Sequence, residues 1–177
     1  NKFRKKSKII VVLLIATIVT FTSFNQSFQN RTQLAFTEIS SWMSGDNNPT
    51  SVSLRLEMYR LAIEKIEDVP FFGHGYRTSN IVVFKNAQSP GGRLSYTYNH
   101  LHNAYLTNYF NGGIVLLGAL LLLLFAPFIL FLKANSQNRT NPVFIAGVLL
   151  TVGYASFGMV NILLGDTYMN GFYTFFL

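Results

Sequence analysis

The sequence predicts an all-α integral membrane protein, a polytopic helical bundle with a long segment outside the bilayer. Half of the 177 residues are hydrophobic and only 12% are charged, whereas soluble domains carry about 25% charge. Several apolar runs approach the roughly 20 residues that an α-helix needs to cross a bilayer. A lipid-exposed span must satisfy its own backbone hydrogen bonds, so these runs should be helical. This composition excludes a disordered chain, a collagen-like chain and a typical soluble enzyme.

The first apolar run is slightly short and carries Thr and Ser hydroxyls, which can bond back to their own helix. Its basic start also fits a secretory signal peptide, but no small-x-small cleavage site follows it. Because the chain begins with Asn1 and ends inside an apolar run, we expect it to be the C-terminal piece of a longer protein. The predicted transmembrane helices are 9–24, 114–132 and 143–164, and 171–177 reads as the start of a fourth.

Basic residues orient the predicted spans. Five Lys and Arg residues precede the first span, and Lys133 and Arg139 lie between the second and third, with no acidic residue in either place. The long segment after the first span carries seven basic and six acidic residues, so it is nearly neutral. Excess Lys and Arg mark the cytoplasmic side. The excess of basic over acidic residues therefore reflects the orientation of the chain in the membrane, and we expect no nucleic-acid partner. The predicted cytoplasmic segments are 1–8 and 133–142, and the predicted outer segments are 25–113 and the turn 165–170.

An amphipathic helix is predicted at 53–68 within the outer segment. Ser51 or Ser53 can cap its start, and Pro70 stops it near Asp68 or Val69. Such a helix between membrane spans should lie against the bundle or at the interface. Its apolar stripe consists of Leu54, Met58, Leu61, Ala62, Ile66 and Val69.

Three further stretches complete the outer segment. Residues 70–77, PFFGHGYR, hold two glycines that allow a tight turn and close backbone approach. No Lys-Ser/Thr pair follows, so this turn is a weak match to a phosphate loop. Residues 78–99 read as a flexible connection and a candidate lid. Residues 99–113, NHLHNAYLTNYFNGG, then run directly into the second span.

The order of these motifs resembles the O-antigen ligase family of polytopic glycosyltransferases, over roughly residues 50–125. The motifs are Arg-Leu-x-x-aromatic, Pro-x-x-Gly-x-Gly, a variable stretch, and His-Asn-x-x-Leu leading into a span with Gly near its start. Tyr59 stands where the family often has Trp, and a further essential Arg of the family belongs to an earlier outer loop that this sequence does not contain. The matching residues are Arg55, Leu56, Tyr59, Pro70, Gly73, Gly75, His102, Asn103, Leu106 and Gly112 or Gly113.

The resemblance implies a membrane enzyme of the bacterial inner membrane with a fold like that of C-type glycosyltransferases. Such enzymes act in lipopolysaccharide biosynthesis on the periplasmic face. They transfer a glycan from undecaprenyl pyrophosphate to a sugar hydroxyl of lipid A–core, without a metal or cofactor. Close relatives polymerise O-antigen units or glycosylate proteins from the same donor, and nothing in this sequence separates these activities. A non-enzymatic transporter subunit or sensor remains a second alternative.

Arg55 is the candidate residue for holding the diphosphate of that donor. Departure of the diphosphate builds negative charge, and a guanidinium binds phosphate in a bidentate manner while staying charged. The structural alternative is a surface Arg that pairs with a carboxylate or snorkels to headgroups. Arg60, Arg77 and Arg93 are second-rank phosphate ligands, and acidic residues within one helical turn favour an ion pair for Arg60.

His102 is the candidate base, because imidazole titrates near neutral pH and the acceptor hydroxyl must lose a proton. The alternative is a His that caps the next helix or lies at the interface. Asn103 can cap that helix or bind a substrate hydroxyl. His100 would share a face with His102 on a strand but not on a helix, and a metal site there lacks further ligands. Asp166, near the outer end of the third span, is either a functional carboxylate or part of a turn.

Overall fold

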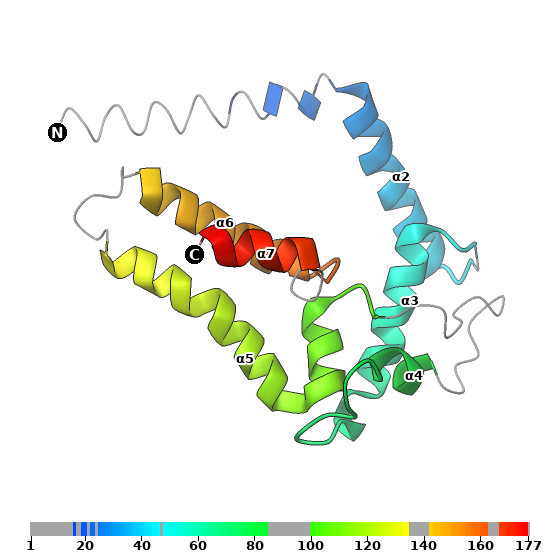
Figure 1. The fold of residues 1–177 in the computed structure, drawn as a ribbon. Helices are drawn as coiled ribbons and strands as arrows, with labels where there is room; N and C mark the ends of the chain where they lie inside the picture. Colours follow the sequence, from blue (N-terminus) through cyan, green and yellow to red (C-terminus); the bar gives the residue numbers. More distant parts are fainter. Residues whose placement is uncertain are drawn as a thin grey trace. The chain divides into compact units, whose positions relative to one another are not determined.

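The computed structural model describes residues 16, 19–20, 22–23, 25–46, 48–84, 100–134, 142–162 and 167–176. These residues form helices and their connections, with no strand among them, which agrees with the predicted all-α class (Figure 1). The predicted basic segment 1–8 and nearly all of the predicted span 9–24 lie outside the described residues. The chain divides into two compact units, Asn1–Ser53 and Leu54–Leu177, which are described separately.

The first unit contains a helix that the sequence did not predict, α2 at Gln26–Met43. The side chain of Asn25 caps it by accepting a hydrogen bond from the Phe28 amide at 3.0 Å. Its sequence has neither Gly nor Pro, and Phe28, Ala35, Ile39 and Trp42 recur at helical spacing, but none of its residues is buried. A turn that begins at Ser44 follows the helix.

The predicted amphipathic helix is present as α3, Ser51–Glu64, followed by the short 3₁₀ helix η1, Ile66–Asp68. Its cap differs from the prediction. Thr50 is the capping residue, because its hydroxyl accepts from the Ser53 amide at 3.1 Å, while the Ser53 hydroxyl accepts from the Thr50 amide at 2.8 Å. This reciprocal arrangement satisfies two backbone donors at the helix start.

The apolar stripe of α3 builds a small core for the outer segment. Met58, Leu61 and Ala62 are buried against residues from a short helix, α4 at Ser79–Phe84, and from the segment around Leu101. Residues 79–84 of the expected flexible connection are therefore ordered by burial, and residues 85–99 lie outside the described ranges. The ammonium group of Lys65 donates to the Val82 and Val83 carbonyl oxygens, both at 2.8 Å, at the end of α4.

The long helix α5, Ala104–Ala134, bends at Gly112 and Gly113, where the backbone leaves helical geometry. Its second arm begins at Ile114, the first residue of the predicted span. Among the described residues, one helix is long and apolar enough to cross a bilayer. It is Ala104–Lys133, which is nearly the whole of α5. The bend separates a first arm, whose Phe110 packs in the core with α3 and α4, from an apolar second arm (Figure 1).

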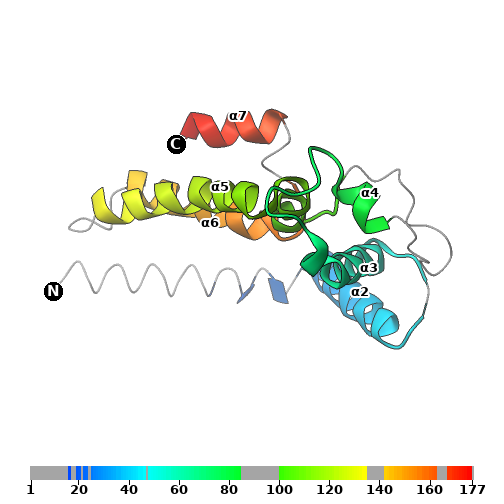
Figure 2. The same ribbon diagram turned by 90° about the horizontal axis from the view of Figure 1, so that it is seen from below.

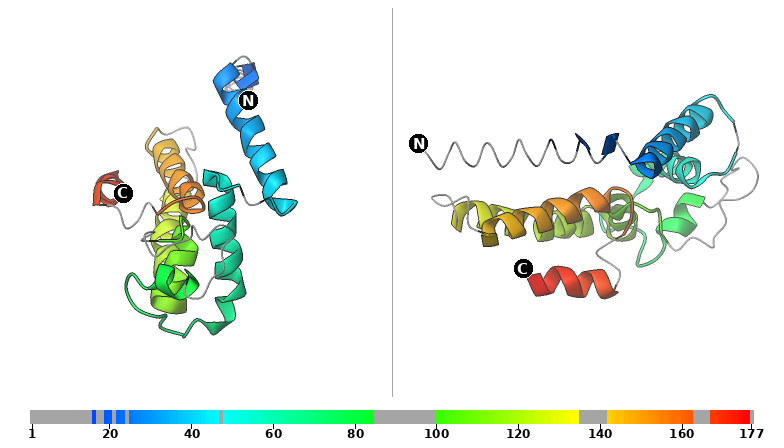
Figure 3. Two further views of the ribbon diagram at one scale, coloured as in Figure 1. Left: turned by 90° about the vertical axis from the view of Figure 1, so that its right-hand side faces the viewer. Right: turned by 90° about the horizontal axis from the view of Figure 1, so that it is seen from above.

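Two further apolar helices follow, of which the first lies along α5 and the second contacts the first (Figures 2 and 3). The third predicted span is the helix α6, Pro142–Gly158, which ends at Gly158 rather than at 164. The helix α7, Thr167–Phe176, begins before the predicted position 171, inside the predicted turn. Tyr hydroxyls join these helices, since Tyr154 donates to the Met169 carbonyl oxygen at 2.7 Å and Tyr173 donates to that of Leu123 at 2.9 Å.

Candidate functional site

The glycine turn after η1 docks directly onto the bend of α5. The amides of His74 and Gly75 donate to the Phe110 and Asn111 carbonyl oxygens, both at 2.9 Å, and the Ile114 amide donates to that of Phe71 at 3.2 Å. These bonds satisfy backbone groups that the bend removes from the helix. The turn and the helix therefore complete each other's hydrogen bonding.

Two glycines make this approach possible. A Cβ at Gly73 would lie 2.5 Å from the backbone of Asn111, and a Cβ at Gly113 would lie 2.7 Å from the Gly73 nitrogen. Both residues also have positive φ, 72° and 62°, which side chains other than hydrogen disfavour. The Pro-x-x-Gly-x-Gly motif and the Gly pair at the start of the span are thus two halves of one contact.

The side chain of Asn111, beside the bend, caps α4. Its carbonyl oxygen accepts from the amides of Thr78 and Ser79 at 3.2 and 2.9 Å. These amides lie at the N-terminus of α4 and have no partner within that helix. Asn111 therefore connects α5 to α4 through its side-chain amide and to the glycine turn through its backbone carbonyl oxygen.

The segment 100–103 presents His102 just before α5. Asn103 is the capping residue of α5, since its side-chain oxygen accepts from the Leu106 amide at 3.0 Å, which agrees with the capping alternative. Leu101 is fully buried, and its amide donates to the Thr107 hydroxyl at 3.2 Å. His102 has a φ of 48°, in the left-handed region, where residues other than Gly are uncommon. The flanking contacts hold His102 in this strained conformation.

Arg55 and Tyr59 approach His102 from one face of α3. They are four residues apart, so they are neighbours on the helix surface. The Tyr59 hydroxyl donates to the His102 carbonyl oxygen at 2.8 Å. The Arg55 guanidinium is close enough that its charge lowers the pKa of His102 and opposes the rise that burial causes in the pKa of Tyr59. The structure therefore brings the two leading candidate residues into one site.

His102 is held in its neutral form at neutral pH. Burial lowers its pKa from the usual 6.5, the charge of Arg55 lowers it further, and a hydrogen bond with the Asn161 side chain partly opposes these effects. The His100 ring centre lies 4.4 Å from that of His102. Burial and the neighbouring His102 also lower the pKa of His100. A neutral imidazole has a lone pair that can accept a proton.

The other predicted residues are placed differently. Arg60 forms ion pairs with Glu57, at 2.6 Å, and with Glu64, which agrees with the ion-pair alternative. Arg77 lies in the exposed turn, with its guanidinium carbon 5.4 Å from the centre of the Tyr76 ring. Within the described part of the chain, no three His, Cys, Asp or Glu side chains gather. Arg93 and Asp166 lie outside the described residues.

Two residues of the site were missed by the sequence reasoning. Tyr59 enters the sequence analysis only as the aromatic of the first family motif, and Asn161 lies unnamed within the predicted span 143–164. Tyr59 donates to the Met159 carbonyl oxygen at 3.1 Å, and so does the Asn103 side chain, also at 3.1 Å. These bonds bring the end of α6 to the start of α5. In the sequence, Asn161 is a polar residue at the end of an apolar run. This marks it as unusual but does not indicate which residue it contacts.

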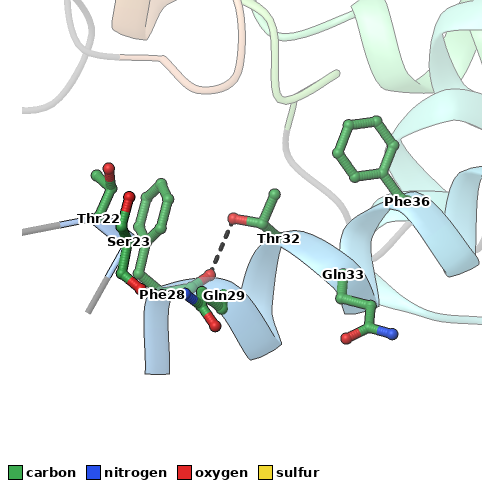
Figure 4. A pocket seen from close by; sticks show the side chains of 7 residues that line it. All are labelled: Thr22, Ser23, Phe28, Gln29, Thr32, Gln33 and Phe36. Carbon is green, nitrogen blue, oxygen red and sulfur yellow. Dashed lines mark hydrogen bonds between the residues drawn. The ribbon is translucent and has the colours of Figure 1, made fainter. Parts of the chain in front are cut away.

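Two hollows of the structure lack the charges that a diphosphate requires. One, of 430 Å³, lies along α2 beside Phe28, and Thr32 and Gln33 are among its lining residues (Figure 4). The other, of 870 Å³, is lined by apolar side chains of α6 and α7, such as Leu149 and Phe172. Neither has a charged residue in its lining. The cluster around Arg55 and His102 is therefore the better candidate site.

Comparisons with known proteins agree on one family. The model of the family described as O-antigen ligase matches residues 1–121. An uncharacterized protein of Haemophilus influenzae is 29% identical over 162 residues, which cover 87% of this chain and 40% of the relative. The O-antigen ligase of Escherichia coli K12 is 25% identical over 169 residues, which cover 93% of this chain and 38% of the relative. The chain thus spans about two fifths of these relatives. No solved structure matches it.

Proposed function

Because the chain belongs to the O-antigen ligase family, we propose that it is part of an inner-membrane glycosyltransferase of lipopolysaccharide biosynthesis. The donor is a glycan on undecaprenyl pyrophosphate, and the acceptor is a sugar hydroxyl of lipid A–core. The reaction takes place on the periplasmic face, where the basic-residue pattern places residues 25–113.

The proximity of Arg55 and His102 is the observation that supports this proposal most. The two residues come from distant parts of the chain, and the charge of one lowers the pKa of the other. The Tyr59 hydroxyl, one helical turn from Arg55, binds the His102 carbonyl oxygen. A cation for the leaving diphosphate and a neutral base for the attacking hydroxyl are thus available together.

In the proposed reaction, the acceptor oxygen attacks the anomeric carbon of the donor glycan. A glycosidic C–O bond forms, and the bond from that carbon to the diphosphate oxygen breaks. His102 takes the acceptor proton. The Arg55 guanidinium binds the departing diphosphate and stabilises the charge that develops on it. The planar guanidinium can donate two parallel hydrogen bonds, so it favours a phosphate over an acceptor with a single oxygen atom.

Glycan transfer by purified full-length protein tests these roles. His102→Ala should lower the rate by about 10²–10⁴-fold, as expected for the loss of a general base. Arg55→Ala should lower it by about 10- to 100-fold, because hydrogen bonds to charged groups contribute about 1.5–3 kcal/mol. Arg55→Lys should recover only part of the loss. Arg31→Ala, on α2, is the matched control and should transfer at the wild-type rate.

Near-wild-type transfer by both the Arg55→Ala and His102→Ala variants would show that the assignment is wrong. Lipopolysaccharide gels of a deletion strain distinguish the related activities. Loss of all capped core indicates a ligase, whereas core that carries a single repeat indicates an O-antigen polymerase. Unchanged lipopolysaccharide with loss of glycan from proteins indicates a protein O-glycosyltransferase.

A further inference from the structure

Two exposed phenylalanine rings lie in the glycine turn. Phe71 is 65% exposed and Phe72 is 74% exposed, although phenylalanine is among the residues most often buried. Their ring centres lie 4.9 Å apart and the ring planes meet at 83°, so the two rings pack edge to face on each other. The turn therefore presents a small apolar surface made of two adjacent side chains.

Backbone bonds fix the height of this surface relative to α5. The Phe71 carbonyl oxygen accepts from the amide of Ile114 at 3.2 Å, and Ile114 is the first residue of the apolar arm after the bend. The Gly73 amide donates to the Pro70 carbonyl oxygen at 2.8 Å, which closes the turn around Phe71 and Phe72. The two phenylalanines therefore lie level with the point where the apolar arm begins.

The apolar arm itself is a surface for lipid. It belongs to the helix that is long and apolar enough to cross a bilayer, and several of its side chains are exposed, among them Ile114, Val115, Leu122 and Phe125. When this arm enters the hydrocarbon at Ile114, the residues that are bonded to its first turn lie at the level of the headgroups. The exposed rings of the turn are thus continuous with the lipid-facing surface of α5.

Tyr76 and Arg77 add the polar chemistry of a membrane interface to the same turn. Tyr76 is 81% exposed, and the Arg77 guanidinium carbon lies 5.4 Å from the centre of its ring. Tyrosine is enriched at membrane–water interfaces, and an Arg can extend its charge to headgroups while its stem lies on apolar surface. Phenylalanine has no polar atom to bind a sugar hydroxyl, so a lipid surface fits Phe71 and Phe72 better than a glycan does.

We propose that Phe71 and Phe72 form an interfacial anchor that inserts into the headgroup–acyl boundary of the leaflet that the apolar arm of α5 enters. The partner is membrane lipid, and Arg77 is available to a lipid phosphate. This inference goes beyond the proposed reaction, because it depends neither on Arg55 and His102 nor on which side of the bilayer the outer segment lies. The anchor holds the glycine turn against the membrane surface.

Spin labels measure the depth of the anchor in full-length protein, in nanodiscs of phosphatidylethanolamine and phosphatidylglycerol. This sequence has no Cys, so after replacement of any Cys elsewhere a single label is attached to Phe72→Cys, Glu67→Cys or Leu122→Cys. Glu67 is exposed in η1 and serves as the reference in water, and Leu122 is exposed on the apolar arm and serves as the reference in hydrocarbon. The label at position 72 should collide with oxygen more often than with a water-soluble nickel complex. Its depth should lie between the two references, about 5–10 Å into the headgroup–acyl boundary.

Photocrosslinking in native membranes checks the same position without a spin label. A p-benzoylphenylalanine in place of Phe72 should form lipid adducts, and the same group in place of Glu67 should form none. Equal nickel accessibility at positions 72 and 67 would overturn the proposal, since the rings would then face water or a glycan. A label at position 72 that is shielded from both oxygen and nickel, with crosslinks to protein alone, would also overturn it, because another part of the protein would then cover the rings.

Discussion

The Tyr59 hydroxyl lies 2.8 Å from the carbonyl oxygen of His102, and this bond joins the helix that carries Arg55 to the segment that carries the candidate base. Burial raises the pKa of Tyr59, so the hydroxyl keeps its proton and remains a donor at neutral pH. The same hydroxyl reaches Met159 at the end of α6. One phenol thus connects three parts of the chain that are far apart in sequence.

Tyr59→Phe should therefore weaken the site while preserving its packing. We expect a loss of about 1 kcal/mol in stability, the usual contribution of one hydrogen bond, and a several-fold slower transfer because His102 is less well held. Thermal unfolding and the transfer rate measure the two effects. Tyr76→Phe is the matched control, because Tyr76 is 81% exposed, and equal behaviour of the two variants would contradict the role of Tyr59.

Gly113→Ala should disrupt the contact between the glycine turn and α5. The new Cβ would lie 2.5 Å from the Phe71 carbonyl carbon, and the positive φ of Gly113 adds strain, so we expect a loss of about 1–3 kcal/mol or more. Gly118→Ala adds the same methyl group to the same helix with no atom within 4 Å. Limited proteolysis of the outer segment in native membranes should reveal cleavage in Gly113→Ala alone. Equal protease resistance of both variants would argue against the contact.

Asn111→Ala should release the start of α4. Both amides that the Asn111 side chain binds would lose their partner, and the loss of such a cap costs about 1 kcal/mol. Hydrogen exchange at Thr78 and Ser79 should accelerate. Asn108→Ala serves as the control, since the Asn108 amide donates only to the Ala104 carbonyl oxygen of its own helix, at 2.7 Å. Unchanged exchange in Asn111→Ala would be inconsistent with capping.

The transfer rate should depend on pH in a direction set by His102. The base must be neutral, and its pKa lies below 6.5 because burial and Arg55 disfavour the imidazolium. Activity should therefore be constant near pH 7 and fall only as the pH drops through this lowered pKa. A rate profile at constant ionic strength measures this limb, and a midpoint at or above pH 6.5 would contradict the assignment.

The predicted topology can be tested by cysteine labelling, since this sequence contains no Cys. A cysteine introduced at Glu67, an exposed residue of η1, should react with a membrane-impermeant maleimide applied from the periplasmic side. A cysteine at Arg139, in the predicted cytoplasmic loop, should react only after the membrane is permeabilised. The reverse pattern would invert the predicted orientation.

Local patterns predicted the helix α3 and the start of the second span, because periodicity and glycines act over a few residues, but residues 79–84 of the expected flexible connection form α4. The helix α2 was missed, although its apolar residues recur at helical spacing, because they stand in a largely polar segment; none of its residues is buried. The bonds of Tyr59 and Asn103 to the Met159 carbonyl oxygen and the fit of Gly73 against Gly113 were also not predictable. Such contacts depend on tertiary packing, which a single sequence does not encode in any local spacing.

The turn after η1 and the bend of α5 meet through peptide groups rather than through side chains. No flexible side chain separates the two backbones, so they should move together. The depth at which the apolar arm settles in the hydrocarbon therefore also sets the height of the turn above it. A donor anchored in the same leaflet carries its phosphates at a nearly constant level. If the proposed donor binds here, bilayers of different thickness should consequently change how well its phosphates meet the site, even when every residue of the site is intact.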